Sequence, residues 1–227
     1  MVTATVNLAA TAVATDSLGP GRRAVVWVQG CPLNCRGCVA PDWIPLETNR
    51  IVTPEALAAQ ILAMPRIGGL TLSGGEPMLQ AAALADVVRR VRAVRDLDVI
   101  CFSGFTLARL RDNPPTPAVA ELLAVIDVLI DGPYVAARDN GRGLRGSDNQ
   151  AINHLTDRLR GSEYDFADRP RTAELHVDAR SVTLVGVPPP GLLTALDAAR
   201  ARHTSHAPRT PLALESAGPE IVSEVLG

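Results

Sequence analysis

Lysine is absent from this chain, and aromatic residues make up only 3% of it. All 22 positively charged residues are therefore arginines, and with 24 acidic residues they give a net charge of −2. A chain without an overall positive field has no general attraction for a phosphate backbone. We therefore do not expect nucleic acid as a partner.

Long apolar runs are also missing. No stretch approaches 18 consecutive apolar residues, which is about the length that a membrane-spanning helix needs. Residues 1–16 lack the basic start and the uninterrupted apolar core of a signal peptide. We therefore expect a cytoplasmic protein with no membrane partner.

The length and the apolar content suffice for one full hydrophobic core. The chain has 227 residues, of which 47% are hydrophobic and 20% are charged, as is typical of a single globular domain. Prolines and scattered polar residues follow His203. We expect one domain over residues 1–203 and a weakly ordered tail over residues 204–227.

Cysteine is scarce too, but three of the four cysteines are crowded into one stretch. Cys31, Cys35 and Cys38 have the spacing C-x3-C-x2-C and follow an apolar run. A disulfide would pair two of them and leave the third over, and cytoplasmic thiols stay reduced. Three thiolates can hold three corners of a four-iron cubane, which leaves one iron without a protein ligand.

A structural zinc site is the alternative. Zinc in such a site takes four ligands in a closed tetrahedron, whereas this loop offers three cysteines and no histidine. Cys101, the remaining thiol, lies in the middle of a predicted strand among apolar neighbours, which is typical of a buried inert cysteine. We therefore favour an iron–sulfur cluster over zinc and expect Cys101 in the core.

Strand-like and helix-like segments alternate along the chain. We expect an edge strand over 3–12, further strands over 24–29, 69–72, 98–102 and 127–130, helices from 54, over 79–94, after Thr106 and over 118–125, a hairpin of 173–177 and 181–185, and a last helix over 192–202. This order indicates right-handed βαβ units with a parallel sheet. The repeats are too few for a closed eight-stranded barrel, so we expect an α/β fold that is an open partial (β/α) barrel with a C-terminal hairpin.

Candidate site residues follow four of the predicted strands. Because function in such folds gathers where parallel strands end, we expect these loops to meet. Gly74 and Gly75 would let backbone approach a ligand closely, and Glu76 could support an ammonium group. Ser103 and Asp131 could meet polar groups of a ligand, or they could be turn residues that satisfy backbone donors.

A basic, glycine-rich loop over residues 140–146 is expected to be flexible. Arg145, Asn149 and Gln150 could order this loop over the site or against a partner. The alternative is a solvated loop.

Several motifs together carry a family resemblance. The cysteine spacing and the sequence Ser73-Gly74-Gly75-Glu76-Pro77 about 40 residues on resemble the radical S-adenosylmethionine (radical SAM) superfamily. Within it, WVQGC at 27–31, DGPY at 131–134 and RGSDNQ at 145–150 are similar to the activating proteins of anaerobic ribonucleotide reductase. The resemblance runs from about residue 7 to about residue 190.

This resemblance implies a cofactor set and a division of roles. A 4Fe-4S cluster would be held by Cys31, Cys35 and Cys38, and its open iron would bind S-adenosyl-L-methionine. One electron would then break the sulfonium bond and give a 5′-deoxyadenosyl radical that abstracts hydrogen. The residues implied to bind the methionine amino group of S-adenosyl-L-methionine are Ser73, Gly74, Gly75 and Glu76. The whole site that we expect for this cofactor adds Ser103, Asp131, Gly37 and Val39.

One position departs from the family pattern. The residue before the third cysteine is usually aromatic and lies near the adenine, whereas here it is Gly37. Backbone groups of Gly37 and Val39 would still reach the base. Trp43 could compensate, or it could be a packing residue.

The resemblance also implies a reaction and its partners. We expect an oxidoreductase that installs a glycyl radical on a larger enzyme, anaerobic ribonucleotide reductase, with electrons from flavodoxin or ferredoxin. One alternative is a radical SAM enzyme acting on a small molecule, such as a deazapurine synthase. The other is a non-enzymatic metal-binding interaction module.

Overall fold

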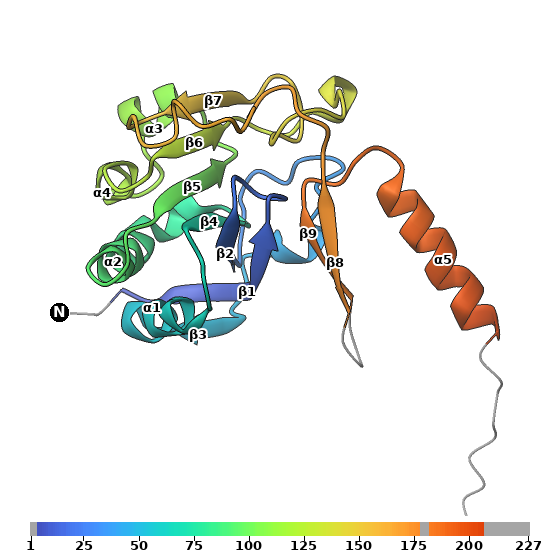
Figure 1. Ribbon diagram of the computed structural model, residues 1–227, viewed down its shortest axis with the longest axis horizontal. Helices are drawn as coiled ribbons and strands as arrows, with labels where there is room; N and C mark the ends of the chain where they lie inside the picture. The colour runs from blue at the N-terminus through green and yellow to red at the C-terminus, as the bar shows by residue number, and fades with distance from the viewer. Residues whose placement is uncertain (1–3, 178–181, 207–227) are drawn as a thin grey trace, which may run out of the picture. The chain divides into compact units, whose positions relative to one another are not determined.

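The computed structural model describes residues 4–177 and 182–206 and divides the chain into two compact units, residues 1–190 and 191–227 (Figure 1). The second unit contains α5 (Leu192–His206), which ends four residues beyond the predicted helix end at 202. The turn predicted at 178–180 and the tail after residue 206 lie outside the described residues. The domain boundary after residue 203 stays a prediction.

The first unit is built on a seven-stranded mixed sheet. Its strands are β1 (Val6–Thr15), β2 (Arg22–Val28), β3 (Arg50–Val52), β4 (Gly69–Gly74), β5 (Asp98–Ser103), β6 (Val128–Asp131) and β7 (Ala151–His154). The order is β3-β1-β2-β4-β5-β6-β7, with β2, β4, β5 and β6 parallel. Helices alternate with these parallel strands, which confirms the predicted α/β class and parallel core. In the described part of the chain the sheet is open. A radical SAM partial barrel is compatible with this sheet.

Three features of the sheet differ from the sequence prediction. The first strand is not an edge strand, because β3 pairs with β1 on the side away from β2. Neither β3 nor β7 is predicted from the sequence. Both are antiparallel strands of three or four residues at the ends of the sheet, too short to carry an apolar period.

Two helices begin where the sequence places their caps. The first unit contains η1 (Pro41–Trp43), α1 (Pro54–Ala63), η2 (Pro77–Gln80), α2 (Ala81–Arg92), α3 (Leu107–Asp112), α4 (Val119–Leu123) and η3 (Ala136–Arg138). The hydroxyl of Thr53 accepts a hydrogen bond from Ala56 N, and that of Thr106 accepts one from Arg109 N. The helix predicted over 79–94 is split, because its first turn is the 3-10 turn η2.

Apolar side chains form a core on each face of the sheet. On one face, α1, α2 and α4 cover the strands (Figure 1), and Cys101 lies in this core with no exposed surface, as predicted. On the other face, Trp27 and Ile100 pack against Leu144, Phe166 and Val185, which come from later in the chain. The hairpin β8 (Ala173–Val177) and β9 (Val182–Gly186) therefore contributes to the second core. Within the described residues, none of the helices is long and apolar enough to cross a bilayer.

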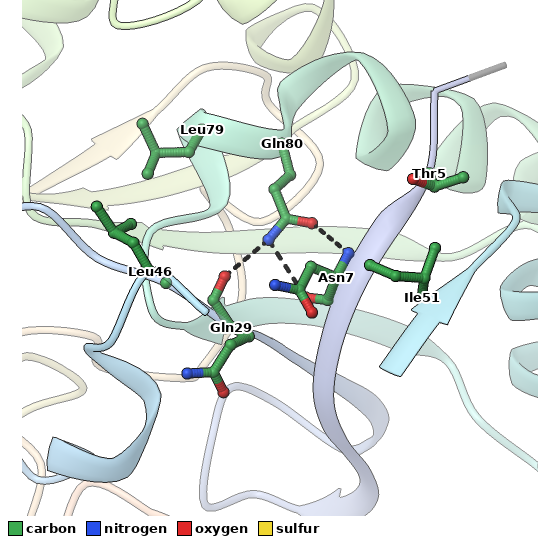
Figure 2. A pocket seen from close by; sticks show the side chains of 8 residues that line it. Thr5, Asn7, Gln29, Leu46, Ile51, Leu79 and Gln80 are labelled. Atoms are coloured by element: carbon green, nitrogen blue, oxygen red, sulfur yellow. Dashed lines mark hydrogen bonds between the residues drawn. The ribbon is translucent and has the colours of Figure 1, made fainter. Parts of the chain in front are cut away.

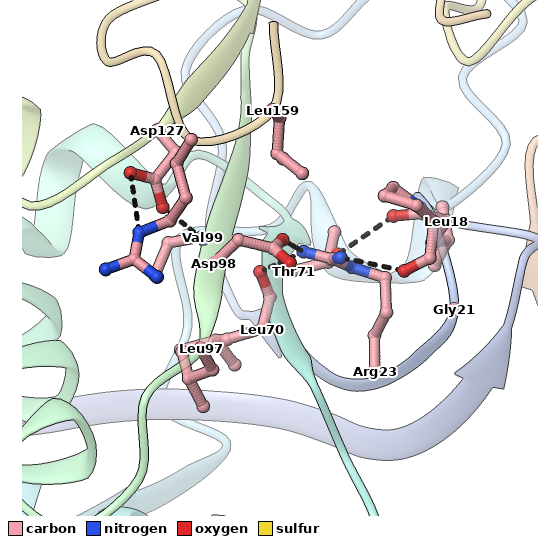
Figure 3. A network of polar contacts seen from close by, with 12 residues as sticks. Leu18, Gly21, Arg23, Leu70, Thr71, Leu97, Asp98, Val99, Asp127 and Leu159 are labelled. Atoms are coloured by element: carbon pink, nitrogen blue, oxygen red, sulfur yellow. Dashed lines mark hydrogen bonds and ion pairs between the residues drawn. The ribbon is translucent and has the colours of Figure 1, made fainter. Parts of the chain in front are cut away.

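A buried ion pair joins the strands at their N-terminal ends, opposite the predicted site (Figure 3). The fully buried guanidinium of Arg23 on β2 contacts Asp98 Oδ1 on β5 at 2.5 Å. It also donates to Thr71 Oγ1 at 2.9 Å and to the carbonyl of Leu70 at 3.0 Å on β4. Three neighbouring parallel strands are thus tied together by one side chain.

Removing the acidic partner should destabilise the fold. Asp98→Ala leaves the Arg23 charge buried with neutral partners only, and we expect a loss of about 3 kcal/mol in the free energy of unfolding. Asp96→Ala is the control, because the Asp96 side chain is 81% exposed in its pair with Arg158 and should cost less than about 1 kcal/mol. Urea denaturation measures both, and equal effects would contradict this account of the ion pair.

Candidate functional site

The three clustered cysteines lie on a loop that leaves the C-terminal end of β2. Each is free and half-buried. The base of the loop is closed by two backbone hydrogen bonds of 2.9 Å, from Gly30 N to Trp43 O and from Cys31 N to Ile44 O. We call residues 31–43 the cysteine loop. The fold thus presents three thiols on one closed loop at the end of a parallel strand.

Three cysteine thiols are soft donors of the kind that hold iron–sulfur clusters. Within the described residues, no three His, Cys, Asp or Glu side chains converge as ligands of a single metal ion. Burial raises the pKa of the Cys31 thiol above its ordinary value. A backbone hydrogen bond from Leu33 lowers this pKa in part, and the Glu76 carboxylate raises it further. Cys31 must lose its proton to bind iron, so cluster binding would release that proton.

The two glycines after β4 lie against the base of the cysteine loop. Gly74 has φ +102°, and a Cβ there would lie 2.5 Å from Val28 N; a Cβ on Gly75 would lie 2.3 Å from Gly30 O. The contact is fastened by hydrogen bonds from Gly75 N to Val28 O (2.7 Å) and from Glu76 N to Gly30 O (2.8 Å). Glycine is therefore required at positions 74 and 75 for contact between two backbones. The sequence alone does not reveal this requirement. A role toward a ligand stays a prediction for both.

Glu76 is fully buried where β4 and β5 end. Its carboxylate accepts hydrogen bonds from Ser103 Oγ (2.9 Å), Gly104 N (2.8 Å) and Met78 N (3.0 Å). Burial raises the pKa of Glu76 to about 7, although these three bonds lower it. Three bonds use three of the roughly four acceptor positions of a carboxylate, so one position remains for a further donor.

The side chains of Ser103 and Asp131 both form hydrogen bonds within the chain, at the ends of β5 and β6. The Ser103 hydroxyl donates to Glu76 and accepts from Phe105 N at 3.1 Å. The Asp131 carboxylate accepts from Leu107 N at the start of α3. The structure therefore brings Ser103 to Glu76 and directs Asp131 to a helix end, as the turn-residue alternative expected. Their binding of a ligand stays a prediction.

Gly37 and Val39 lie on the exposed part of the cysteine loop. Gly37 has φ +80°, and a Cβ there would lie 3.5 Å from Cε1 of Tyr134, while Val39 is 50% exposed. Trp43 stacks on Trp27 with the ring centroids 5.3 Å apart, so it is a packing residue. The aromatic ring beside Gly37 is that of Tyr134, which belongs to the DGPY motif but is not predicted at the site from the sequence.

The loop over residues 145–150 is ordered by its own polar side chains. The Gln150 amide accepts from Gly146 N at 2.7 Å and donates to Gly132 O at 2.7 Å. Asn149 Nδ2 donates to Pro133 O at 2.8 Å. These bonds fasten the loop to the segment that follows β6, and its place over the site or against a partner stays a prediction.

Comparison with known proteins identifies the family. Residues 17–153, more than half of the chain, match the family model of the 4Fe-4S single cluster domain. The anaerobic ribonucleoside-triphosphate reductase-activating protein of Vibrio cholerae is 36% identical over 147 residues, which are 61% of this chain and 91% of the relative. The chain belongs to this family of activating proteins.

Other relatives agree with this assignment. The proteins of the same name from Pasteurella multocida and Salmonella typhi are 35% and 31% identical, and the matches cover 90% and 91% of their lengths. As a member of the activating family, the chain is an enzyme of the glycyl-radical activating type, so the non-enzymatic module is excluded. The cysteine loop and the Glu76 segment both lie within the matched residues 17–153.

Glu76 should make stability depend on pH. Its pKa rises from 4.5 in the unfolded chain to about 7 in the folded one, so its contribution is full below pH 4.5 and is lost as pH rises through 7. We expect the free energy of unfolding of the metal-free, reduced protein to fall by at most about 3 kcal/mol between pH 5 and pH 8.

The substitution Glu76→Gln should remove most of this fall, as measured by urea denaturation at the two pH values. Glu121→Gln, on an exposed side chain of α4, is the matched control and should keep the wild-type pH dependence. An unchanged pH dependence in Glu76→Gln would show that another group is responsible.

Proposed function

We propose that the chain is a radical SAM enzyme that reductively cleaves S-adenosyl-L-methionine and installs a glycyl radical on anaerobic ribonucleotide reductase. The observation that carries this proposal is the closed loop with three half-buried free thiols at the end of β2, within the residues that match the 4Fe-4S family model. The parallel strands β2, β4, β5 and β6 would form the radical SAM partial barrel.

The three cysteines would hold the cluster, and they would leave one iron free. Cys31, Cys35 and Cys38 would each bind one iron as a thiolate. When bound, the cluster would supply one electron to the sulfonium of S-adenosyl-L-methionine, and the cleavage would give the 5′-deoxyadenosyl radical. The half-buried positions of the thiols would shield this chemistry from water while leaving the loop surface accessible.

The segment after β4 would hold the methionine end. The remaining acceptor position of the buried Glu76 carboxylate would receive the ammonium group. Ser73, Gly74 and Gly75 would line this end, because their strand is bonded directly to the base of the cysteine loop.

The ribose and the adenine would lie toward the later strands. Ser103 and Asp131 follow β5 and β6 and would meet the ribose or the methionine polar groups. Gly37 and Val39 would present backbone groups to the base.

The reductase and an electron donor are the proposed partners. The relatives are named as activators of anaerobic ribonucleoside-triphosphate reductase, which favours a protein substrate over the small-molecule alternative. Val39 and Leu46, 50% and 73% exposed, give the loop region an accessible apolar surface for a protein partner. We propose flavodoxin or ferredoxin as the electron donor and the cytoplasm as the compartment.

Anaerobic reconstitution with iron and sulfide tests the proposal. The protein, incubated with the reductase, S-adenosyl-L-methionine and dithionite, should give a glycyl radical signal by EPR and release 5′-deoxyadenosine. Cys38→Ala should abolish both, because the cluster loses one of its three ligands.

Cys101→Ala is the matched control, because Cys101 is buried in the core and should be dispensable for the cluster. A preparation that binds one zinc per chain and cleaves no S-adenosyl-L-methionine would contradict the proposal. Cleavage without a radical on the reductase would instead point to a different substrate.

A further inference from the structure

Four neutral amide side chains surround the base of the cysteine loop: Asn7, Gln29, Asn49 and Gln80. We call them the amide clamp. Figure 2 shows Asn7, Gln29 and Gln80 close together. These three residues line a hollow of about 260 Å³. Asn7 lies on β1, Gln29 directly follows β2, Asn49 directly precedes β3 and Gln80 ends η2, so the clamp exists only in the folded chain.

Gln29 bonds to residues 42–49, through which the chain leaves the cysteine loop. We call residues 42–49 the returning segment. It is only 3% exposed and immediately precedes Gly30. Its Nε2 donates to the carbonyls of Asp42 at 3.3 Å and Pro45 at 3.0 Å. One side chain thus connects the chain entering the cysteine loop with the chain leaving it, next to the two backbone bonds at the loop base.

Asn7 and Asn49 make further hydrogen bonds that attach the returning segment to β1 and to Gln29. Asn7 Nδ2 donates to Glu47 O at 2.8 Å, and Asn7 Oδ1 accepts from Asn49 N at 2.8 Å. Asn49 Nδ2 donates to Gln29 Oε1 at 3.3 Å. The returning segment is therefore bonded to β1 as well as to Gln29.

Gln80 adds the segment that carries Glu76. Its Nε2 donates to Gln29 O at 3.0 Å and to Asn7 O at 3.2 Å, and its Oε1 accepts from Asn7 N at 2.7 Å. Gln80 ends η2, the turn capped by Glu76. The same four amides therefore hold both the cysteine loop and the Glu76 segment, and none of them carries a charge that titrates.

We propose that Gln29 and Gln80 are positioning residues, which fix the cysteine loop relative to the Glu76 segment. The inference has two parts. The cluster part rests on the proposed function: the clamp would set the position of the cluster relative to the methionine end of S-adenosyl-L-methionine. The loop-fixing part concerns the chain alone and can be tested without metal.

The substitution Gln29→Glu keeps the size of the side chain but replaces the Nε2 donor by an oxygen that faces two carbonyls. In the metal-free protein, we expect amide hydrogen exchange in peptides covering residues 30–44 to become about tenfold faster or more. Exchange in α2, residues 81–92, should be unchanged. Gln80→Glu should have the same effect and serves if Gln29→Glu does not fold.

Two control variants separate positioning from general stability. Gln60→Glu alters an exposed glutamine on α1 whose Nε2 donates to Thr11 Oγ1 at 2.8 Å. Leu122→Ala leaves a cavity in the core beside α4 and destabilises the whole unit. Neither should accelerate exchange at residues 30–44 selectively. Equal exchange in Gln29→Glu, Gln80→Glu and wild type would overturn the inference.

The reconstituted protein gives the second measurement. Release of iron to a ferrous chelator should be about tenfold faster or more in Gln29→Glu than in wild type and in Gln60→Glu. A wild-type protein that assembles no cluster would overturn the proposed function and the cluster part of this inference, while the exchange result would still decide the loop-fixing part. Iron release at the wild-type rate in both clamp variants would overturn the cluster part alone.

Discussion

The structure of the site depends on close contact between two backbones, which two glycines at the end of β4 make possible. Gly74 and Gly75 allow the end of β4 to lie against Val28 and Gly30, with hydrogen bonds of 2.7 and 2.8 Å across the contact. A methyl group at either glycine would collide with backbone atoms, which cannot move without shifting a central strand. This contact fixes the cysteine loop and the Glu76 segment as neighbours.

The buried carboxylate of Glu76 extends the same connection to the next strand. Ser103 and Gly104 donate to it from the end of β5, so the loops after β2, β4 and β5 form one bonded unit. Burial raises the pKa of this carboxylate to about 7, because the hydrogen bonds from its three neutral donors offset the loss of solvation only in part. A cationic ligand would stabilise the charged form of this carboxylate, because its opposite charge would offset the solvation that burial removes.

The sequence was sufficient for those parts of the fold that follow local rules. The caps at Thr53 and Thr106, the four parallel strands and the burial of Cys101 follow from periodicity and capping chemistry, and the structure confirms them. The short strands β3 and β7, the inner position of β1 and the amide clamp depend on contacts between distant segments, which no local pattern encodes. For the same reason, the sequence located the cysteines but did not place Tyr134 beside Gly37.

The central claim is that three cysteines hold a 4Fe-4S cluster and leave one iron open to S-adenosyl-L-methionine. Mössbauer spectroscopy of protein reconstituted with ⁵⁷Fe, recorded with and without this compound, tests the claim most directly. The account predicts that adding the compound changes the parameters of one iron in four and leaves the other three as they were. Four irons that are indifferent to the compound, or no iron–sulfur signal at all, would contradict it.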